Sequence, residues 1–274
     1  MNMDPKRLGF HPHDLAGIQH WNSIYGSVAP LSQTSNWTPQ SHDQRALAYA
    51  LQRAIGTRRV QSILEVGCGN SVWLSYLARL TGAQVVGLDY SPNGCELARH
   101  QLASQGIPGR VVCGDLFKAT VDEIGQFDLV FSLGLVEHFD NLDAVLTALA
   151  RFVRPGGILF TEVPNLSSFH GLLARIWHPE LLAKHQIVTR RHLAETYPRI
   201  GFKAVQSGYA GRFSLDIVAW ELYPRWPRLA PKVTPRVRRL QKHVERLMAR
   251  VRNFEGSRVF APYIYVFGVK EDCK

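Results

Sequence analysis

Two glycines separated by one residue lie in the stretch SILEVGCGNSVWL, residues 62–74. An apolar run reaches an acid, Glu65, and the glycines Gly67 and Gly69 follow it. Because glycine has no side chain, the backbone N–H groups of such a loop can approach a ligand closely. The pattern predicts a strand that ends in a ligand-binding loop.

Two acids end the next apolar runs of the chain. Asp89 closes AQVVGLD, 22 residues beyond Gly67, and Asp115 closes GRVVCGD. A carboxylate at the position of Asp89 can accept hydrogen bonds from both hydroxyls of a ribose. The loop lacks the GK[ST] ending of a Walker phosphate loop, and Val72 occupies the third glycine position of the dinucleotide fingerprint. Nothing in this loop therefore requires a pyrophosphate.

The elements that must position these residues alternate along the chain. Near-continuous apolar runs alternate with helical segments of about 10–15 residues, which indicates a parallel sheet covered on both faces. The predicted strands are 60–66, 83–89, 109–115, 127–133, 156–163, 201–210 and 262–270. The predicted helices are one that begins after Ser41, then 71–81, 92–105, 141–154 and 190–199. The predicted fold class is α/β, doubly wound, in which ligands bind beyond the carboxyl ends of the strands.

The sequence divides into four parts. Residues 1–40 are irregular and form an N-terminal cap segment, and residues 41–163 form the alternating core. A helical lid insertion is expected at 164–200. Residues 201–274 return to the C-terminal strands of the core and carry a basic helical insertion at about 211–258.

Five motifs stand in order at the predicted strand ends: LEVGCGNS, VVGLDYS, VVCGDLF, FDLVFSLGLVEHF and VRPGGILF. They resemble the motifs of class I S-adenosylmethionine-dependent methyltransferases, above all the small-molecule branch (methyltransferase type 11/12) that includes the ubiquinone-biosynthesis O-methyltransferases. The resemblance covers residues 43–163 and the final strand. It implies a Rossmann-like, seven-stranded sheet, mostly parallel with an antiparallel last strand, and S-adenosyl-L-methionine as the cofactor.

The resemblance also implies which residues hold the methionine and ribose parts of the cofactor. Gly67 and Gly69 would lie against the methionine moiety, and Glu65 would order the loop. Asp89 would hold the ribose hydroxyls. The family often has a further glycine where this chain has Ser71, a variation that the loop tolerates.

The adenine and the amino group of the cofactor have their own implied contacts. Tyr90 would flank the adenine, Asp115 would accept from its amino group, and Leu116 would pack on the ring. A backbone carbonyl of Ser132 or Leu133 would face the amino group of the ligand.

The acceptor side is predicted around Glu137 and His138, which follow the fourth strand. His138 is a candidate general base because imidazole titrates near neutrality, and Glu137 is its acidic neighbour. A structural alternative is that either residue caps the helix that starts near Asn141. The ubiquinone-type enzymes have the metal-site pattern ExxEH, but Gly134 replaces the first acid here, so no metal is predicted. Similar EHF sequences occur in other enzymes of this fold, and the motif does not fix the acceptor.

Aromatic residues and imidazoles gather in the expected lid. Such walls suit a flat or partly apolar acceptor, although most of these side chains are expected to be packing residues. The N-terminal segment is expected to close over the cofactor through Trp21 and Tyr25, as in similar enzymes. The candidate lid residues are His170, Trp177, His178, His185, Tyr209, Phe213, Trp220, Tyr223 and Trp226.

The positive charge of the chain is local. The formal net charge is +10, but residues 225–252 hold ten Lys or Arg and one acid, Glu245, so the rest of the chain carries only +1. A helix with Thr234 as N-cap and Pro235 at its first position is predicted there. Its apolar stripe packs a lid or a homodimer in one interpretation, and its basic face meets an anionic membrane or substrate in another. The stripe consists of Val237, Leu240, Val244, Leu247 and Val251.

The function favoured by the sequence is methyl transfer to an oxygen or nitrogen of a small-molecule metabolite. The alternatives are a peripheral-membrane methyltransferase of a lipid or cell-envelope saccharide, a nucleic-acid methyltransferase, and a cofactor-binding protein without catalysis. The absence of a [DNS]PPY motif after the fourth strand and the near-neutral body disfavour nucleic acid.

Composition and cysteine use suggest a compartment. Hydrophobic residues make up 46% of the chain and charged residues 20%, as is usual for globular proteins. No apolar run is long enough to span a membrane, and the N-terminus lacks the apolar region of a secretory signal. The four cysteines form no CxxC pair. We expect a cytoplasmic protein, with peripheral membrane contact as the alternative.

Overall fold

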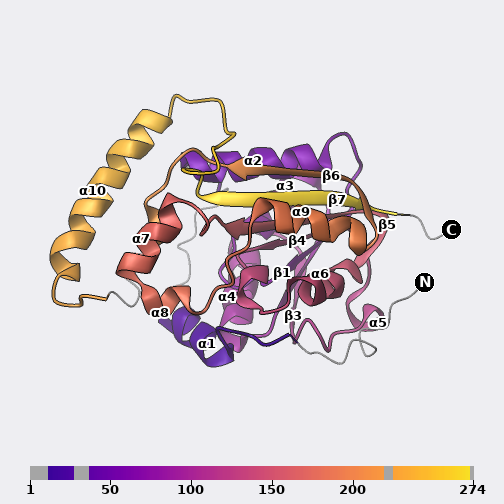
Figure 1. The fold of residues 1–274 in the computed structure, drawn as a ribbon. Coiled ribbons are helices and arrows are strands. Elements are labelled where there is room, and N and C mark those ends of the chain that lie inside the picture. Colours follow the sequence, from indigo (N-terminus) through magenta and orange to yellow (C-terminus); the bar gives the residue numbers. More distant parts are fainter. Residues whose placement is uncertain (1–11, 28–36, 219–224, 272–274) are drawn as a thin grey trace.

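A seven-stranded sheet forms the centre of the computed structural model, which describes residues 12–27, 37–218 and 225–271 (Figure 1). The strand order is β3-β2-β1-β4-β5-β7-β6. Strands β1 to β5 are parallel to one another, whereas β7 pairs antiparallel with both β5 and β6. The predicted α/β fold with an antiparallel last strand is confirmed. The strands are β1 Ser62–Val66, β2 Gln84–Asp89, β3 Gly109–Cys113, β4 Phe127–Leu133, β5 Val153–Pro164, β6 Phe202–Ala210 and β7 Tyr263–Lys270.

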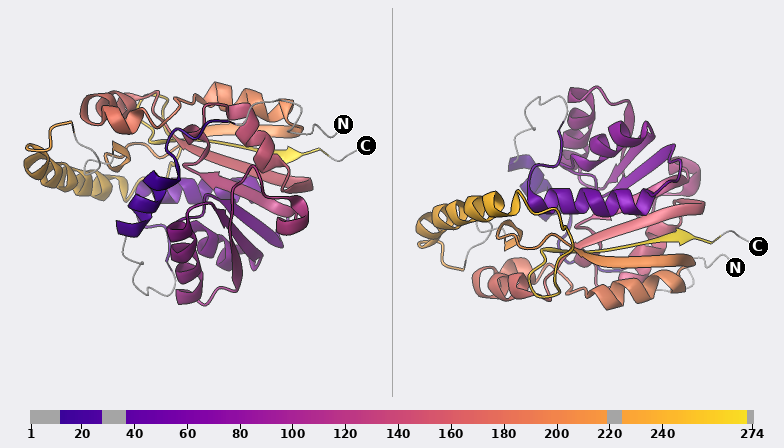
Figure 2. Two further views of the ribbon diagram at one scale, coloured as in Figure 1. Left: turned by 90° about the horizontal axis from the view of Figure 1, so that it is seen from below. Right: turned by 90° about the horizontal axis from the view of Figure 1, so that it is seen from above.

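Helices cover both faces of the sheet and form two separate apolar cores (Figure 2). Leu51 of α2 (His42–Ile55) and Leu77 of α3 (Trp73–Thr81) belong to one core. Leu146 of α6 (Leu142–Ala150) and Leu193 of α9 (Arg190–Arg199) belong to the other. The remaining elements of the core layers are α4 Pro92–Ser104, α5 Val121–Ile124 and the 3₁₀ turn η2 Val136–His138.

The chain changes direction between β1 and β4, and this change positions the site. From β1 the chain builds outward through β2 to β3, and then returns to place β4 on the other side of β1. The loops after β1 and β4 therefore diverge and leave a crevice at the carboxyl edge of the sheet. The last residues of β1, β2 and β4, and the segments that follow β1, β2 and β3, carry all the predicted cofactor residues except Tyr25.

Four further helices lie at the end of the molecule where the parallel strands finish (Figure 1). They are α1 Ile18–Ser27, α7 Phe169–Trp177, α8 Pro179–Leu182 and α10 Ala230–Met248, and the short η3 Asp216–Val218 precedes α10. In the described residues, no helix is both long and apolar enough to cross a membrane.

The predicted start of the basic helix is wrong. Helix α10 begins at Ala230, so Pro235 lies inside the helix and Thr234 is a buried residue of its second turn. The reason is a second proline, Pro231, which occupies the first turn. Proline is tolerated there because the N–H it lacks would have no helical partner.

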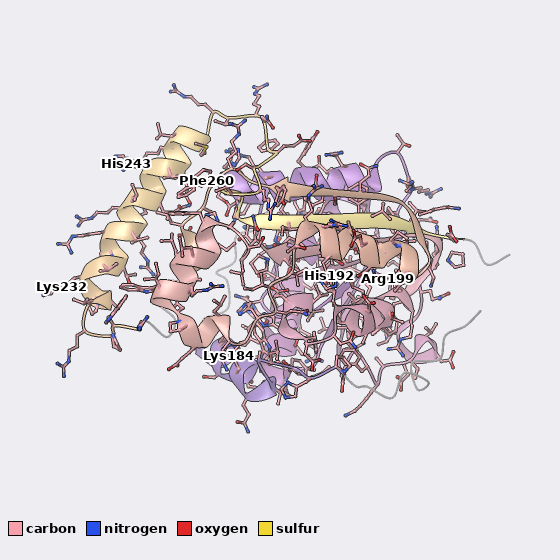
Figure 3. The ribbon with its side chains drawn as sticks, in the orientation of Figure 1. Lys184, His192, Arg199, Lys232, His243 and Phe260 are labelled. Carbon is pink, nitrogen blue, oxygen red and sulfur yellow. The ribbon has the colours of Figure 1, made fainter. Side chains whose placement is uncertain are left out.

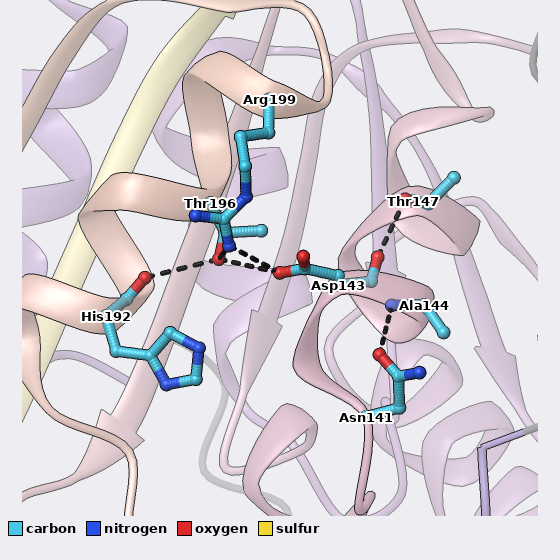
Figure 4. Close-up of polar contacts among 7 residues, drawn as sticks. All are labelled: Asn141, Asp143, Ala144, Thr147, His192, Thr196 and Arg199. Atoms are coloured by element: carbon cyan, nitrogen blue, oxygen red, sulfur yellow. Dashed lines mark hydrogen bonds and ion pairs between the residues drawn. The ribbon is translucent and has the colours of Figure 1, made fainter.

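Polar contacts fasten α9 to α6 (Figure 4). The carboxylate of Asp143 accepts hydrogen bonds from Thr196 Oγ1 at 3.0 Å and Arg199 Nη2 at 2.8 Å. Asn141 caps α6 by accepting from the N–H of Ala144 at 3.0 Å. The segment before α9 is thereby held near η2, where Gln186 donates its N–H to the Glu137 carbonyl at 2.6 Å.

The buried hydroxyl of Tyr197 provides a test of this packing. Tyr197 is fully buried, and its Oη lies 2.8 Å from Thr161 Oγ1 on β5 and 3.1 Å from the Val266 carbonyl on β7. Replacing Tyr197→Phe removes these contacts from the core and should lower the free energy of unfolding in urea by about 1–3 kcal/mol. The exposed control Tyr49→Phe should change it by less than about 0.5 kcal/mol. Equal stability of the two variants would contradict this account.

Candidate active site

A cavity of about 530 Å³ opens at the carboxyl edge of the sheet. Its walls come from the ends of β1, β2 and β4, from the segment after β3, and from the N-terminal segment. Eight of the residues predicted from sequence to hold the cofactor or act in catalysis line it: Tyr25, Gly67, Asp89, Tyr90, Asp115, Leu116, Leu133 and His138. The lining does not include four others, Glu65, Gly69, Ser132 and Glu137.

Asp89 ties the glycine loop to the end of β2. Its Oδ2 accepts the N–H of Gly69 at 2.9 Å, and its Oδ1 accepts the N–H of Ser91 at 2.8 Å. Gly67 and Gly69 have positive φ angles of 77° and 24°, which residues other than glycine rarely adopt. A Cβ on Gly67 would lie 3.1 Å from Leu135 Cδ1, on the cavity wall. The two glycines are therefore required by backbone conformation and by close packing, against Leu135 at Gly67 and against Tyr25 at Gly69.

Glu65 lies beneath the loop rather than in the cavity. Only 1% of the residue is exposed, and its carboxyl group is hydrogen-bonded to the side chain of Ser71 and the backbone of Leu74. Burial raises the pKa of Glu65 to about 8, so the carboxyl group is largely protonated at neutral pH. Its contacts join the strand end to the start of α3, in keeping with the predicted ordering role.

Polar and apolar groups alternate along the wall formed by β2 and β3. The hydroxyl of Tyr90 donates to Asp14 Oδ2 at 2.5 Å. Asp115 Oδ1 accepts the N–H of Phe117 at 2.9 Å, and Leu116 is buried beside it. Such a wall can hold a flat heterocycle between apolar contacts and a carboxylate.

The two residues predicted for the amino-group contact lie at the end of β4. Leu133 lines the cavity, whereas Ser132 is fully buried and pairs with Thr161 of β5.

The N-terminal segment covers one side of the cavity, as the sequence predicted for Trp21 and Tyr25. Both rings line it and stack on each other at 5.8 Å between centroids. The Tyr25 ring packs so closely on Gly69 that a Cβ there would collide with its hydroxyl. Burial, followed by the charge of Asp89, raises the pKa of Tyr25, which keeps its phenol neutral.

Asp14 is a site residue that the sequence analysis missed. It accepts from Tyr90, and its Oδ1 accepts the N–H groups of Ala16 and Gly17, both at 2.9 Å. A backbone bridge to Phe139 holds the segment across the cavity. The only sequence signal was the stretch Asp-Leu-Ala-Gly in an irregular segment, and an Asp shortly before a Gly is common in turns.

Glu137, His138 and His185 form a cluster beside the cavity, which His138 lines. Their candidate ligand atoms all lie within 4.8 Å of one another, and His138 Nε2 is 3.9 Å from Glu137 Oε1. His138 Nδ1 lies 2.9 Å from the Lys184 carbonyl, so this nitrogen donates and Nε2 carries the lone pair. Two imidazoles and a carboxylate could hold a divalent metal ion, with the carbonyl contact orienting His138.

Burial controls the charges in this cluster. It raises the pKa of Glu137 to about 8. It also lowers the pKa of His138 to about 3, with the neighbouring His185 adding to the effect. Both side chains are therefore largely neutral at physiological pH, and the imidazole of His138 is free to accept a proton.

The other candidate lid residues pack away from the cavity. His170 and His178 are fully buried, and Trp177 packs against Trp226 with ring centroids 5.7 Å apart. Trp220 and Tyr223 lie outside the described residues. His185 is the residue of this group that reaches the cluster around His138, at 4.4 Å between ring centroids.

Known proteins resemble the central part of this chain in sequence. Residues 64–161 match the family described as a methyltransferase domain. A ubiquinone biosynthesis O-methyltransferase of Methylobacterium nodulans is 34% identical over 104 residues, which are 38% of this chain and 41% of that protein. One of Escherichia coli O6:H1 is 28% identical over 159 residues, which are 58% and 62% of the two chains. The matched part thus spans less than two thirds of these curated relatives.

Solved structures of methyltransferases share the fold over most of the chain. The plantazolicin methyltransferase BpumL, in complex with a triazolic desmethylPZN analog and SAH, superposes with a TM-score of 0.55 at 15% identity and covers 94% of this chain and 96% of that one. A SAM-dependent methyltransferase from Archaeoglobus fulgidus gives a TM-score of 0.53 at 17% identity, with 82% and 94% covered.

The buried carboxyl group of Glu65 makes stability depend on pH. Between its ordinary pKa of 4.5 and the raised value of about 8, the unfolded chain releases a proton that the folded chain keeps. The wild type should therefore lose stability relative to Glu65→Gln as pH rises through this window, by up to about 1.4 kcal/mol per pH unit. Urea unfolding at pH 5, 6.5 and 8 measures the difference, with the exposed Glu96→Gln as control. A constant difference between wild type and Glu65→Gln would show that Glu65 is ionised in the folded protein.

Proposed function

Because the chain carries a class I S-adenosylmethionine-dependent methyltransferase domain, we propose that it transfers a methyl group from S-adenosyl-L-methionine to an oxygen or nitrogen of a small-molecule metabolite. The observation that carries the proposal is the single cavity that unites Gly67, Asp89 and Asp115 with His138. The cavity thus joins a candidate binding site for the nucleoside of the cofactor to a candidate proton acceptor. Residues 41–163 with the C-terminal strands form the cofactor-binding core in this proposal, and residues 164–200 form the lid.

The residues of the cavity fit the cofactor. Gly67 lines the cavity without a side chain, so the methionine part would lie against its backbone. The carboxylate of Asp89 has lone pairs beyond those used by Gly69 and Ser91, and these would accept from the ribose hydroxyls. Tyr90, Asp115 and Leu116 would hold the adenine, and the Leu133 carbonyl would meet the amino group.

The bound cofactor supplies a methyl group that is already activated by its positively charged sulfur. The remaining task of this chain is to place a nucleophile about 3–3.5 Å from that carbon and to exclude water. Trp21, Tyr25 and His138 border the space in which an acceptor would lie, and Trp21 packs edge-on against His138 at 4.9 Å between ring centroids.

His138 would take the proton of the acceptor at Nε2. Its low pKa keeps this atom unprotonated over the physiological range, but also makes it a weak base. It suits an acceptor whose proton becomes acidic only as the methyl bond forms, such as a phenol or an amine. Glu137 holds the backbone next to His138 through its contact with Gln186.

Replacing the acid at the end of β2 tests the cofactor seat. Asp89→Ala should weaken the binding of S-adenosylhomocysteine in calorimetry by about 100-fold or more, because two hydrogen bonds to a charged group are lost. Asp89→Asn, which keeps the shape and one acceptor oxygen, should lose less. Asp122→Ala removes an exposed acid of α5 and should bind like the wild type. An Asp89→Ala protein that is folded and binds within twofold of the wild type would refute the assignment.

The role of His138 can be tested with a panel of phenols, amines and alcohols and labelled S-adenosylmethionine. With any acceptor that is methylated, His138→Ala should reduce turnover by about 10²–10⁴-fold at unchanged cofactor affinity. The exposed His192→Ala of α9 serves as control. Unchanged turnover would show that no base is needed at this position. Parallel assays of His185→Ala with chelator and with added Zn²⁺ or Mg²⁺ separate a metal-bound His138 from a free base.

A further inference from the structure

Helix α10 carries the positive charge of the protein on a side that is not used for packing. Its buried residues are Thr234 and Gln241, and the side chain of Gln241 pairs with the N–H of Leu215 at 2.8 Å and with Ser214 Oγ at 3.4 Å. These polar contacts attach the helix to the segment before η3. The opposite side of α10 faces away from the sheet, and Figure 3 shows Lys232 and His243 there.

Exposed leucines and basic residues lie next to each other on that outer side. Leu229, just before α10, is 48% exposed, and Leu240 and Leu247 of the helix are 56% and 72% exposed. At 100° per residue, Leu240 and Leu247 follow one line along the helix, and a basic strip runs beside this line. The strip consists of Lys232, Arg236, Arg239, His243, Arg246 and Arg250, all exposed.

The acids of this region do not neutralise the strip. Glu245 is the one acid in residues 225–252, and it lies on the inner side, where it contacts Gln241 at 3.3 Å. One interpretation of the sequence was that the apolar stripe would pack in a lid or in a homodimer, and the other was that the basic face would meet an anionic membrane or substrate. The structure leaves Leu240 and Leu247 in solvent, while Val237, Val244 and Val251 are half-buried.

The neighbouring elements also expose apolar side chains. Helix α7 exposes Leu172 by 54% and Ile176 by 47%, and Trp226, 40% exposed, lies between the two helices in sequence and packs against Trp177 of α7. Arg225 lies over the ring of Trp226 at 5.4 Å. Tryptophan beside arginine is a common pairing at the interface between a membrane and water.

We propose that the outer side of α10 docks the protein on an anionic lipid surface, with Leu229, Leu240 and Leu247 entering the headgroup region. An amphipathic helix with apolar residues beside a basic strip binds such a surface both by burying apolar area and by electrostatic attraction to the anionic headgroups. Because both faces would carry the same strong positive charge, association of two copies through this side would be opposed by repulsion. A nucleic acid would use the basic strip but would leave the three leucines in water.

The docking side lies at the same end of the molecule as the cavity. Figures 1 and 2 place α10, α7 and α1 beyond the carboxyl ends of the parallel strands, and Trp21 and Tyr25 of α1 line the cavity. Docking would therefore bring the cavity end, and not the opposite edge of the sheet, toward the lipid.

Co-sedimentation with vesicles tests the proposal on the full chain. The wild type should bind vesicles of 60% phosphatidylcholine and 40% phosphatidylglycerol, bind at least about tenfold more weakly to pure phosphatidylcholine, and be released as salt rises from 0.1 to 0.5 M. Arg236→Gln/Arg239→Gln/Arg246→Gln should weaken binding at least about tenfold. The control Arg59→Gln/Arg99→Gln/Lys203→Gln removes three exposed charges elsewhere and should bind like the wild type.

The leucines separate this proposal from other uses of the helix. Leu240→Ser/Leu247→Ser should weaken binding to anionic vesicles at least about tenfold, whereas Leu80→Ser, which alters an exposed leucine of α3, should not. Thermal unfolding and binding of S-adenosylhomocysteine verify that each variant is folded. The proposal is overturned if the wild type ignores anionic vesicles. It is also overturned if the leucine variant sediments normally, or if the variant instead dissociates a dimer or keeps a tight, leucine-independent affinity for duplex DNA or RNA.

Discussion

The contact between Asp89 and the N–H of Gly69 determines the geometry of the site. The buried carboxylate of Asp89, at the end of β2, accepts the N–H of Gly69, in the loop after β1, at 2.9 Å. The same carboxylate accepts the N–H of Ser91, the N-cap residue of α4. One side chain therefore connects the loop, β2 and α4. Hydrogen bonds to a charged acceptor are strong, and removal of one partner from a buried group costs more than the net value of the bond. The glycines can keep their positive φ angles because this contact holds the loop in place.

The electrostatics of the acceptor end follow from burial. Glu137 and His138 lie side by side in surroundings that disfavour charge on both, so they do not form an ion pair at neutral pH. A neutral imidazole whose Nδ1 donates to the Lys184 carbonyl presents a lone pair at Nε2 in a fixed direction. This arrangement favours a proton acceptor or a metal ligand, and it does not attract an anionic group.

The fold could be predicted from the sequence because apolar residues mark its strands and helices in regular patterns. Buried parallel strands are continuous apolar runs, and the β4 prediction of 127–133 coincides with Phe127–Leu133. Longer deviations arise where tertiary pairing overrides local pattern: β5 begins at Val153, three residues earlier than predicted, because Val153 pairs with Phe127 before a register shift. The cofactor side of the site was predictable for the same reason, since Gly67, Asp89 and Asp115 each follow a strand.

The acceptor side was only partly predictable, because its residues come from irregular segments. Asp14 and His185 are far from His138 in sequence, and loops bring them to it. The Leu15 N–H donates to the His138 carbonyl at 2.8 Å, and the Lys184 carbonyl contacts His138 Nδ1. No local pattern encodes such a contact. The sequence predicted no metal because Gly134 replaces the first acid of the pattern ExxEH, but an imidazole from a distant loop, His185, lies beside Glu137 and His138.

Helix α10 shows the same limit for surfaces. A stripe of apolar residues at helical spacing has one sequence signature whether it packs on protein or on lipid, because both environments bury one side of the helix. What separates the two is the position of the polar anchor. Gln241 takes the inward position, and this rotates Leu240 and Leu247 out of the protein and toward the basic strip. The basic strip therefore lies on the same outer side of the helix as the exposed Leu240 and Leu247.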